Sequence, residues 1–387
     1  MLSMLVVVGG VALAERQTSH QTSVSTGPET DTALRSSALP STVPTTKTTT
    51  ALAPLLPAGQ DASRSTIPWS QIGPGWLLAV SDRGLYVVNP IGGRYMIESW
   101  PTGQPAVGAL ADWSGDSRRA LFTAEGQDTT TIIEVDLATA TSHSFTVAGY
   151  AQPVFTRPNG LAITISAVPL ATSYLERVDL NGHKDLTFPA ELPGAGRVMG
   201  GVLYTADGTD LVVGMTGGLG VFHNDGTTVR ALPMAGNGCQ PLRWWTTGVV
   251  LASCGDLWLV PISGAAPTDL TRGVSSANLG AWQLPGGVYL MQGACGSTWL
   301  AHLGGNGTTS MVKVPGTDPQ GDVWVVGAYG AQLALRVTMS CDVPPPANST
   351  TAPQSLVWFN PATNAVTVLL GPPLSADAVD SALLRDI

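Results

Sequence analysis

The chain of 387 residues is poor in charge, and especially in positive charge. Charged residues make up 12% of it, and 18 Lys and Arg stand against 27 Asp and Glu, which gives a formal net charge of −9. Proteins that bind nucleic acid gather Lys and Arg on one face to neutralise phosphates. Because this composition offers no such basic patch, we expect no nucleic acid partner.

The sequence also lacks the short motifs of common catalytic sites. It has no G-x-S-x-G nucleophile elbow, no H-E-x-x-H zinc motif and no phosphate-binding P-loop. Its five histidines are scattered, and four of them fall in different copies of the repeat described below. Such spacing does not bring ligands to one ion, so we predict no metal site and no cofactor.

Long apolar runs are absent as well. The most apolar stretch near the start, residues 4–14, has eleven residues, whereas a membrane-spanning helix needs about twenty. It ends in Ala12 and Ala14, spaced like a cleavage signal before Glu15. We predict that residues 1–14 are an export signal or an N-terminal anchor, and that the protein is extracellular or associated with the cell envelope.

The next segment, residues 15–66, has little that could form a core. Ser, Thr and Pro account for 25 of its 52 residues. Burial of so few large apolar side chains does not offset the entropy lost on ordering the chain. We predict a disordered stalk that spaces a folded module from the membrane or wall, without insertion of that module into the membrane.

Only four cysteines occur, all in the last three repeats, and four cysteines allow three pairings. Cys239 and Cys254 flank two β-prone segments joined by a turn at residues 246–248, so they face each other if this hairpin is in register. We predict that disulfide, and a second one between Cys295 and Cys341, which end equivalent strands of neighbouring repeats. Free buried thiols are the alternative.

What the sequence does contain is a repeat of about forty to fifty residues. Each copy begins with an aromatic residue that a turn-forming Gly or Asn usually follows within five residues. These aromatics are Trp69, Trp113, Phe155, Tyr204, Trp245, Trp282 and Tyr329. A second β-prone landmark follows each of them, such as IIEVDL at 132 and LVWFNP at 356. This period, with several short strands in each copy, is typical of β-propeller blades.

The predicted fold is therefore all-β, a seven-bladed β-propeller of four-stranded antiparallel blades over residues 67–373. A six-bladed propeller is the alternative. We expect blade 1 to use residues 66–70 as its innermost strand, and ring closure to rest on packing between the first and last blades. The C-terminal tail, residues 374–387, could help that closure. We expect the seven repeat aromatics to pack between adjacent blades.

Three segments carry a family resemblance: ADWSGDSRRALFTA at 111–124, LYTADGTDLVVGMT at 203–216 and, more loosely, FTRPNGLAITIS at 155–166. Their order of aromatic, Ser or Thr, any residue, Asp and Gly resembles TolB-like propeller repeats. The resemblance implies a propeller fold and leaves the activity open, because such propellers serve as binding platforms, as accessory domains of peptidases and as enzymes. The layout also resembles exported envelope propellers of actinobacteria, which implies a location and no activity.

Two charged residues stand out on predicted inner strands. Asp112 lies beside the aromatic of the second repeat, and Arg243 lies in the fifth, at slots that are apolar or small elsewhere. A charge at such a place needs a partner or the wet central channel. We name both as candidate ligand-binding residues; a local salt bridge or a solvated channel lining is the alternative.

Two functions fit these observations. The first is a non-catalytic exported propeller that binds an envelope protein or a wall polymer, with the long connection at residues 341–355 on its binding face. The second is a propeller hydrolase or lyase that acts on a glycan or a small ester near the central channel. Composition and repeats predict the architecture and do not select a ligand or an oligomeric state.

Overall fold

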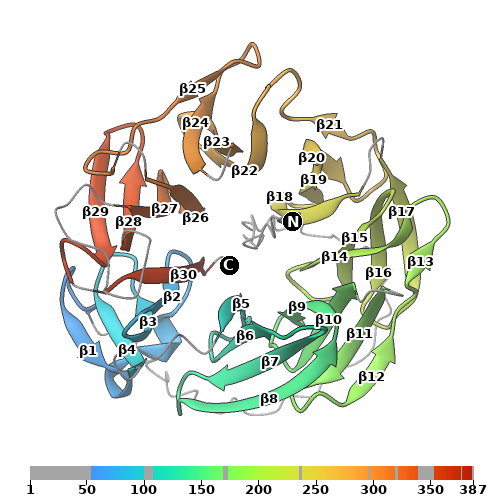
Figure 1. Cartoon of the computed structure of the whole chain (residues 1–387), viewed down its shortest axis with the longest axis horizontal. Coiled ribbons are helices and arrows are strands. Elements are labelled where there is room, and N and C mark those ends of the chain that lie inside the picture. Colours follow the sequence, from blue (N-terminus) through green and yellow to red (C-terminus); the bar gives the residue numbers. More distant parts are fainter. Residues whose placement is uncertain are drawn as a thin grey trace, which may run out of the picture.

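A computed structural model describes residues 54–99, 108–168, 173–234, 238–294, 297–318, 321–338, 353–375 and 377–385. Seven β-sheets form the blades of a propeller around one axis (Figure 1). Each blade contains four antiparallel strands, and the described helices are two single 3-10 turns, η1 (Arg64–Thr66) and η2 (Trp69–Gln71). No helix among the described residues is long and apolar enough to cross a membrane. The predicted seven-bladed fold is confirmed.

The strands run outward from the axis in chain order in blades 2 to 7. In blades 2 and 3 they are β5 (Ala109–Trp113), β6 (Arg119–Glu125), β7 (Thr129–Asp136), β8 (Thr141–Ala148), β9 (Tyr150–Phe155), β10 (Ala162–Val168), β11 (Tyr174–Asp179) and β12 (Lys184–Thr187). In blades 4 and 5 they are β14 (Gly196–Tyr204), β15 (Asp210–Met215), β16 (Gly218–His223), β17 (Thr228–Pro233), β18 (Gln240–Thr246), β19 (Val249–Cys254), β20 (Asp256–Pro261) and β21 (Thr268–Asp269).

Blades 6 and 7 follow the same plan. They consist of β22 (Ala277–Leu284), β23 (Gly287–Ala294), β24 (Ser297–Leu303), β25 (Thr309–Met311), β26 (Val323–Tyr329), β27 (Gln332–Thr338), β28 (Gln354–Asn360) and β29 (Ala365–Leu370). Blade 4 carries an additional short strand, β13 (Glu191–Leu192), which pairs with the start of β14.

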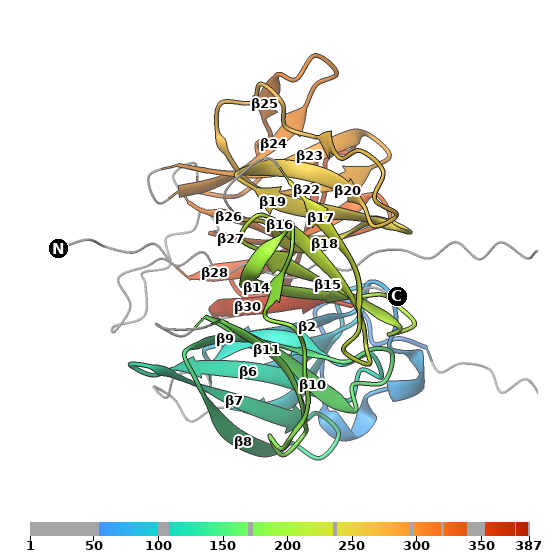
Figure 2. The same cartoon turned by 90° about the vertical axis from the view of Figure 1, so that its right-hand side faces the viewer.

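Blade 1 differs, because it joins strands from both ends of the described chain. Its sheet order is β1-β4-β3-β2-β30, from β1 (Asp61–Ser63), β4 (Arg94–Ser99), β3 (Gly84–Val88) and β2 (Leu77–Ser81) to β30 (Val379–Leu384). The innermost strand is β30, antiparallel to β2, and Figure 2 shows the two side by side from a second direction. The ring is thus closed by hydrogen bonds within one blade.

This arrangement corrects one prediction. Residues 66–70 are not the inner strand of blade 1, since Trp69 starts the 3-10 turn η2 and β30 takes the inner place. Pro68, which precedes that turn, has no N–H to give to a strand ladder. The predicted bounds of the propeller, 67–373, also leave out two strands that the sheet contains, β1 within 15–66 and β30 within 374–387.

The hydrophobic core consists of separate clusters between neighbouring blades. Trp113 joins Leu78 and Val80 between blades 1 and 2, and Tyr204 packs between blades 3 and 4. Four repeat aromatics are almost fully buried, which confirms their predicted packing role: Trp113, Phe155, Tyr204 and Trp282. Trp69 and Trp245 are partly buried, and Tyr329 is 41% exposed, with its ring against Gly75 at the seam between blades 7 and 1.

Inner strands carry a recurring irregularity. The register shifts once in β5, β22 and β26 and twice in β14 and β18. A bulge of this kind bends the strand and redirects the next side chains. Asp112 and Arg243 are each the first residue after such a shift, so the bulges set the direction of both candidate residues.

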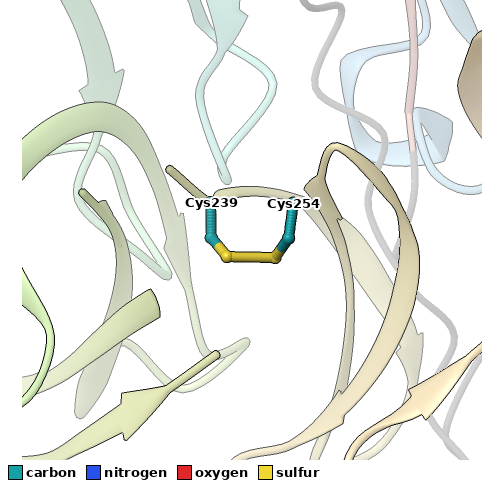
Figure 3. Close-up of a disulfide and its surroundings, with 2 residues drawn as sticks. All are labelled: Cys239 and Cys254. Atoms are coloured by element: carbon teal, nitrogen blue, oxygen red, sulfur yellow. A yellow bond between two sulfur atoms is a disulfide. The ribbon is translucent and has the colours of Figure 1, made fainter. Parts of the chain in front are cut away.

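A disulfide joins Cys239 and Cys254 across the β18–β19 hairpin of blade 5 (Figure 3). The register pairs Gln240 with Ser253, which places the two cysteines opposite each other at the end of the ladder, as predicted. Cys295 and Cys341, with the second predicted disulfide, lie outside the described residues. The same holds for residues 1–53 and for most of the connection at 341–355.

Candidate functional site

Asp112 lies at the inner end of the interface between blades 2 and 3. Its side chain is 6% exposed, and it forms an ion pair with Arg157, whose two terminal nitrogens donate to it at 2.9 and 3.2 Å. The backbone N–H groups of Trp113 and Phe155 also donate to the carboxylate, at 2.8 and 2.7 Å. Four hydrogen bonds therefore satisfy a charge that would otherwise be costly to bury.

The space beside this ion pair is very small. A cavity of about 10 Å³ lies against Asp112, Arg157 and Tyr204. Room of this size suits about one water molecule. Burial raises the pKa of Tyr204 to about 12, so its phenol stays protonated at neutral pH and donates or accepts a hydrogen bond with Thr164 at 2.6 Å. A glycan or ester does not fit in this cavity.

Arg243 is 9% exposed and lies at the inner end of blade 5. Its guanidinium stands over the ring of Trp282 in blade 6 at 4.7 Å and over that of Trp245 at 5.6 Å. Arginine stacked on an aromatic face gains a cation–π attraction that is strongest when water is excluded. Asp112 and Arg243 thus each connect neighbouring blades, and the structure does not bring them together. Ligand contact by either residue stays a prediction.

The histidines are distributed around the ring. His183 lies 3.1 Å from Asp179 in blade 3, and His223 lies 2.5 Å from Asp210 in blade 4. Within the described ranges, His, Cys, Asp and Glu side chains form no group of three or more that could hold a metal ion. The exposed His–Asp pairs sit at strand ends, where they support turns.

A much larger hollow lies at the rim between blades 1 and 2. This open groove, of about 890 Å³, is lined by three segments: residues 61–65, the end of β4 from Met96 to Ser99, and the turn residues Thr139 and Ala140. We call it the rim groove. Its volume falls within the range of about 300–1,000 Å³ that ligand sites occupy.

The turns before the outermost strands differ between blades. In blades 3 and 4, the turn before the outermost strand lies on the outer strand of the preceding blade. A Cβ on Gly182 would come within 2.6 Å of Phe145, and one on Gly226 within 3.1 Å of Leu186. Blade 2 has Ala140 in its turn, also with positive φ. Ala140 packs against the hydrophobic cluster between blades 1 and 2, beside the rim groove.

Two charged side chains of the rim groove have no partner among the described residues. Arg64, half-buried, makes no side-chain hydrogen bond or ion pair there, and the same is true of exposed Glu98. Asp61, in contrast, is bound by Arg94 through two hydrogen bonds of 2.6 and 2.8 Å. The groove therefore presents one uncompensated cation and one uncompensated anion.

Sequence reasoning missed the residues that complete these sites. Arg157, the partner of Asp112, lies in a turn of the next repeat, two residues after Phe155. A basic residue at that turn, beside a lone inner-strand acid, was the signal that could have found it. Arg64 was missed because we assigned residues 15–66 to the stalk, although β1 and η1 belong to the folded part.

Comparison with known proteins gives a fold and no family. The sequence matches no protein-family model and no curated protein sequence. Among solved structures, a prolyl endopeptidase aligns over 81% of this chain with 15% identity and a TM-score of 0.51; the chain spans about half of that protein, 51%. This likeness agrees with the propeller architecture.

Two further similar structures are TolB and an oligogalacturonate lyase. TolB from Acinetobacter baumannii has 13% identity and a TM-score of 0.44, over 81% of this chain and 67% of that one. The lyase from Vibrio parahaemolyticus has 11% identity and a TM-score of 0.46, over 78% and 86%.

Proposed function

We propose that this propeller is an exported binding module that holds an envelope protein or a wall polymer on its surface. The observation that carries the proposal is the contrast between a buried charge that has a partner and rim charges that have none among the described residues. Asp112, at the inner end of the blades, is used in a buried contact between blades, whereas Arg64 and Glu98 at the open rim groove have no charged partner in the described part of the chain. Uncompensated charges beside a groove support recognition of a partner.

Export is supported by the disulfide. Cys239 is fully buried and Cys254 is 6% exposed, so the bond has a structural place in blade 5. Structural disulfides persist mainly in oxidising compartments outside the cytosol. This agrees with the export signal expected at residues 1–14.

The test is retention on envelope material. Purified full-length protein is incubated with cell-wall and membrane fractions of the organism that encodes it, and bound protein is measured as a function of concentration. We expect saturable retention that survives removal of divalent cations by chelation. The unfolded chain serves as the control for non-specific adsorption. No retention above that control, on any fraction, would reject the binding function.

The enzymatic alternative is tested on the same preparation. A panel of glycans and small esters is assayed with the wild type and with Asp112→Asn. We expect no turnover, because the cavity beside Asp112 has room for about one water. Turnover that disappears in Asp112→Asn, while the variant keeps its fold by circular dichroism, would favour the hydrolase or lyase.

A further inference from the structure

We propose that the rim groove binds an extended peptide that carries an acidic and a basic group, with the acid on Arg64 and the base on Glu98. The inference rests on the proposed binding function and names its partner class. It begins from Arg64, whose guanidinium has five N–H donors in a planar fork suited to a carboxylate. None of these donors finds an acceptor among the described residues, although the side chain is half-buried.

Charge complementarity selects a ligand with both signs. The Asp61 carboxylate is already neutralised by Arg94, so it does not compete for Arg64. Glu98 is exposed on the neighbouring strand β4 and repels a purely anionic ligand. A ligand that places a carboxylate on Arg64 and an ammonium group near Glu98 satisfies both side chains at once.

The backbone favours a peptide over a glycan. Strand β1 is the outermost strand of blade 1 and pairs only with β4, in parallel, through Asp61–Arg94, Ala62–Tyr95 and Ser63–Met96. Its other edge has no strand partner among the described residues, and an unpaired edge accepts an extended peptide by adding a strand. Met96, 37% exposed, offers an apolar contact in the same groove.

The geometry also suggests the spacing of the two charges. Arg64 directly follows β1, whose last residue, Ser63, pairs with Met96, two residues before Glu98. Residues i and i+2 of an extended peptide are separated by about 6.6 Å and point to the same side. We therefore expect a preference for an acid and a base two positions apart.

The experiment measures the binding of end-capped hexapeptides by fluorescence anisotropy. One peptide carries Glu and Lys at positions i and i+2, a second carries them in reverse order, and a third has Gln at both places. We expect one of the two charged orders to bind best, and Arg64→Gln and Glu98→Gln to weaken it about tenfold each, as loss of a charge-assisted hydrogen bond predicts. Arg272→Gln, an exposed arginine between blades 5 and 6, is the matched control and should bind like the wild type.

A charge exchange gives the sharper result. The double variant Arg64→Glu and Glu98→Arg should prefer the order that the wild type binds less well, which a merely structural role for these residues would not produce. Equal binding of all three peptides, or a neutral oligosaccharide that competes with the peptide, would overturn the inference. Envelope retention unaffected by Arg64→Gln would also overturn it and leave the proposed function standing. If the wild type itself is not retained on envelope material, the proposed function is rejected.

Discussion

At the scale of single residues, buried charged side chains such as Asp112 hold neighbouring blades of this propeller together. The Asp112 carboxylate accepts hydrogen bonds from Arg157 and from two backbone N–H groups, one of them in the next blade. Arg157 in turn donates to the carbonyl of Phe155 at 3.1 Å. Removing one member of such a set leaves the others buried without a partner, which costs more than the contact itself contributes.

Asp112→Ala is therefore expected to reduce the free energy of unfolding by about 3 kcal/mol, because the Arg157 guanidinium then stays buried without its carboxylate. Denaturant unfolding of both proteins measures the change. Asp128→Ala, at an exposed position, is the control and should stay within about 0.5 kcal/mol of the wild type. Equal stability of the two variants would contradict a cohesive role for Asp112.

Tyr204 makes stability depend on alkaline pH. Burial raises the pKa of Tyr204 from 10.0 to about 12, so the unfolded chain loses this proton first as the pH rises. The stability that the buried, protonated phenol contributes is complete below pH 10 and is lost as the pH rises from 10 towards 12. Two pKa units correspond to about 2–3 kcal/mol.

Unfolding by denaturant at pH 9 and pH 11.5 tests this effect. We expect Tyr204→Phe to lose less stability between the two pH values than the wild type does. Tyr150, 55% exposed, supplies the control variant Tyr150→Phe, which should follow the wild type. A Tyr204→Phe protein with an unchanged pH dependence would show that burial of the phenol does not carry the effect.

At the scale of the elements, each blade depends on its hairpins, and blade 5 is reinforced covalently. Cys239 and Cys254 are separated by 15 positions and close the β18–β19 hairpin. The cross-link restricts the unfolded chain more than the folded one, since the two cysteines are already held opposite each other by the ladder.

The double variant Cys239→Ser and Cys254→Ser should lose about 3 kcal/mol of unfolding free energy, the value that the chain-entropy model gives for a loop of this size. Thermal and denaturant unfolding under non-reducing conditions measure it. Reduction of the wild type should give a similar loss. The double variant could instead be as stable as the oxidised wild type, while reduction still destabilises the wild type. In that case another disulfide is responsible for the loss.

The closing strand is the other element whose contribution can be isolated. Leu384, 8% exposed at the end of β30, packs where a Cβ on Gly327 of β26 would meet it at 2.6 Å. Leu384→Ala should cost about 2–4 kcal/mol, as expected for a large side chain removed from a packed core. Leu374→Ala, 40% exposed, is the control, and equal unfolding midpoints for the two variants would contradict the packing role of β30.

At the scale of the whole molecule, the ring is a set of blades that bury their faces only against each other. Because β30, which follows blade 7 in the chain, pairs with β2 of blade 1, the ends of the repeat array are joined by backbone hydrogen bonds. Arg385 adds side-chain contacts to blade 2, where it donates to the Ser114 and Gly115 carbonyls. Closure thus connects blades 7, 1 and 2.

Removal of residues 379–387 should open the ring. We expect a larger hydrodynamic radius and a broader, less cooperative thermal transition than in the wild type, because the inner edge of β2 and the faces beside it become exposed. A chain that ends after Arg385 is the matched control and should behave like the full-length protein. Identical transitions for both truncated chains would contradict closure by β30.

The repeat period, the turn residues and the alternation of β-prone segments were sufficient to predict seven blades and the Cys239–Cys254 pairing. These features are local: a Gly at a turn, or two cysteines flanking a short hairpin, acts within a few tens of residues. The sequence alone also predicted the burial of Trp113 and Tyr204, since an aromatic at a fixed place in each copy meets the next blade.

Only the tertiary structure decided which distant segments meet. The pairing of β30 with β2, the contact of Asp112 with Arg157 and the rim groove all depend on how residues far apart in the chain are brought together. Such contacts follow from the curvature that closes the ring. A repeat pattern describes what the blades share, whereas the rim groove and the closing pair of strands depend on contacts between particular segments.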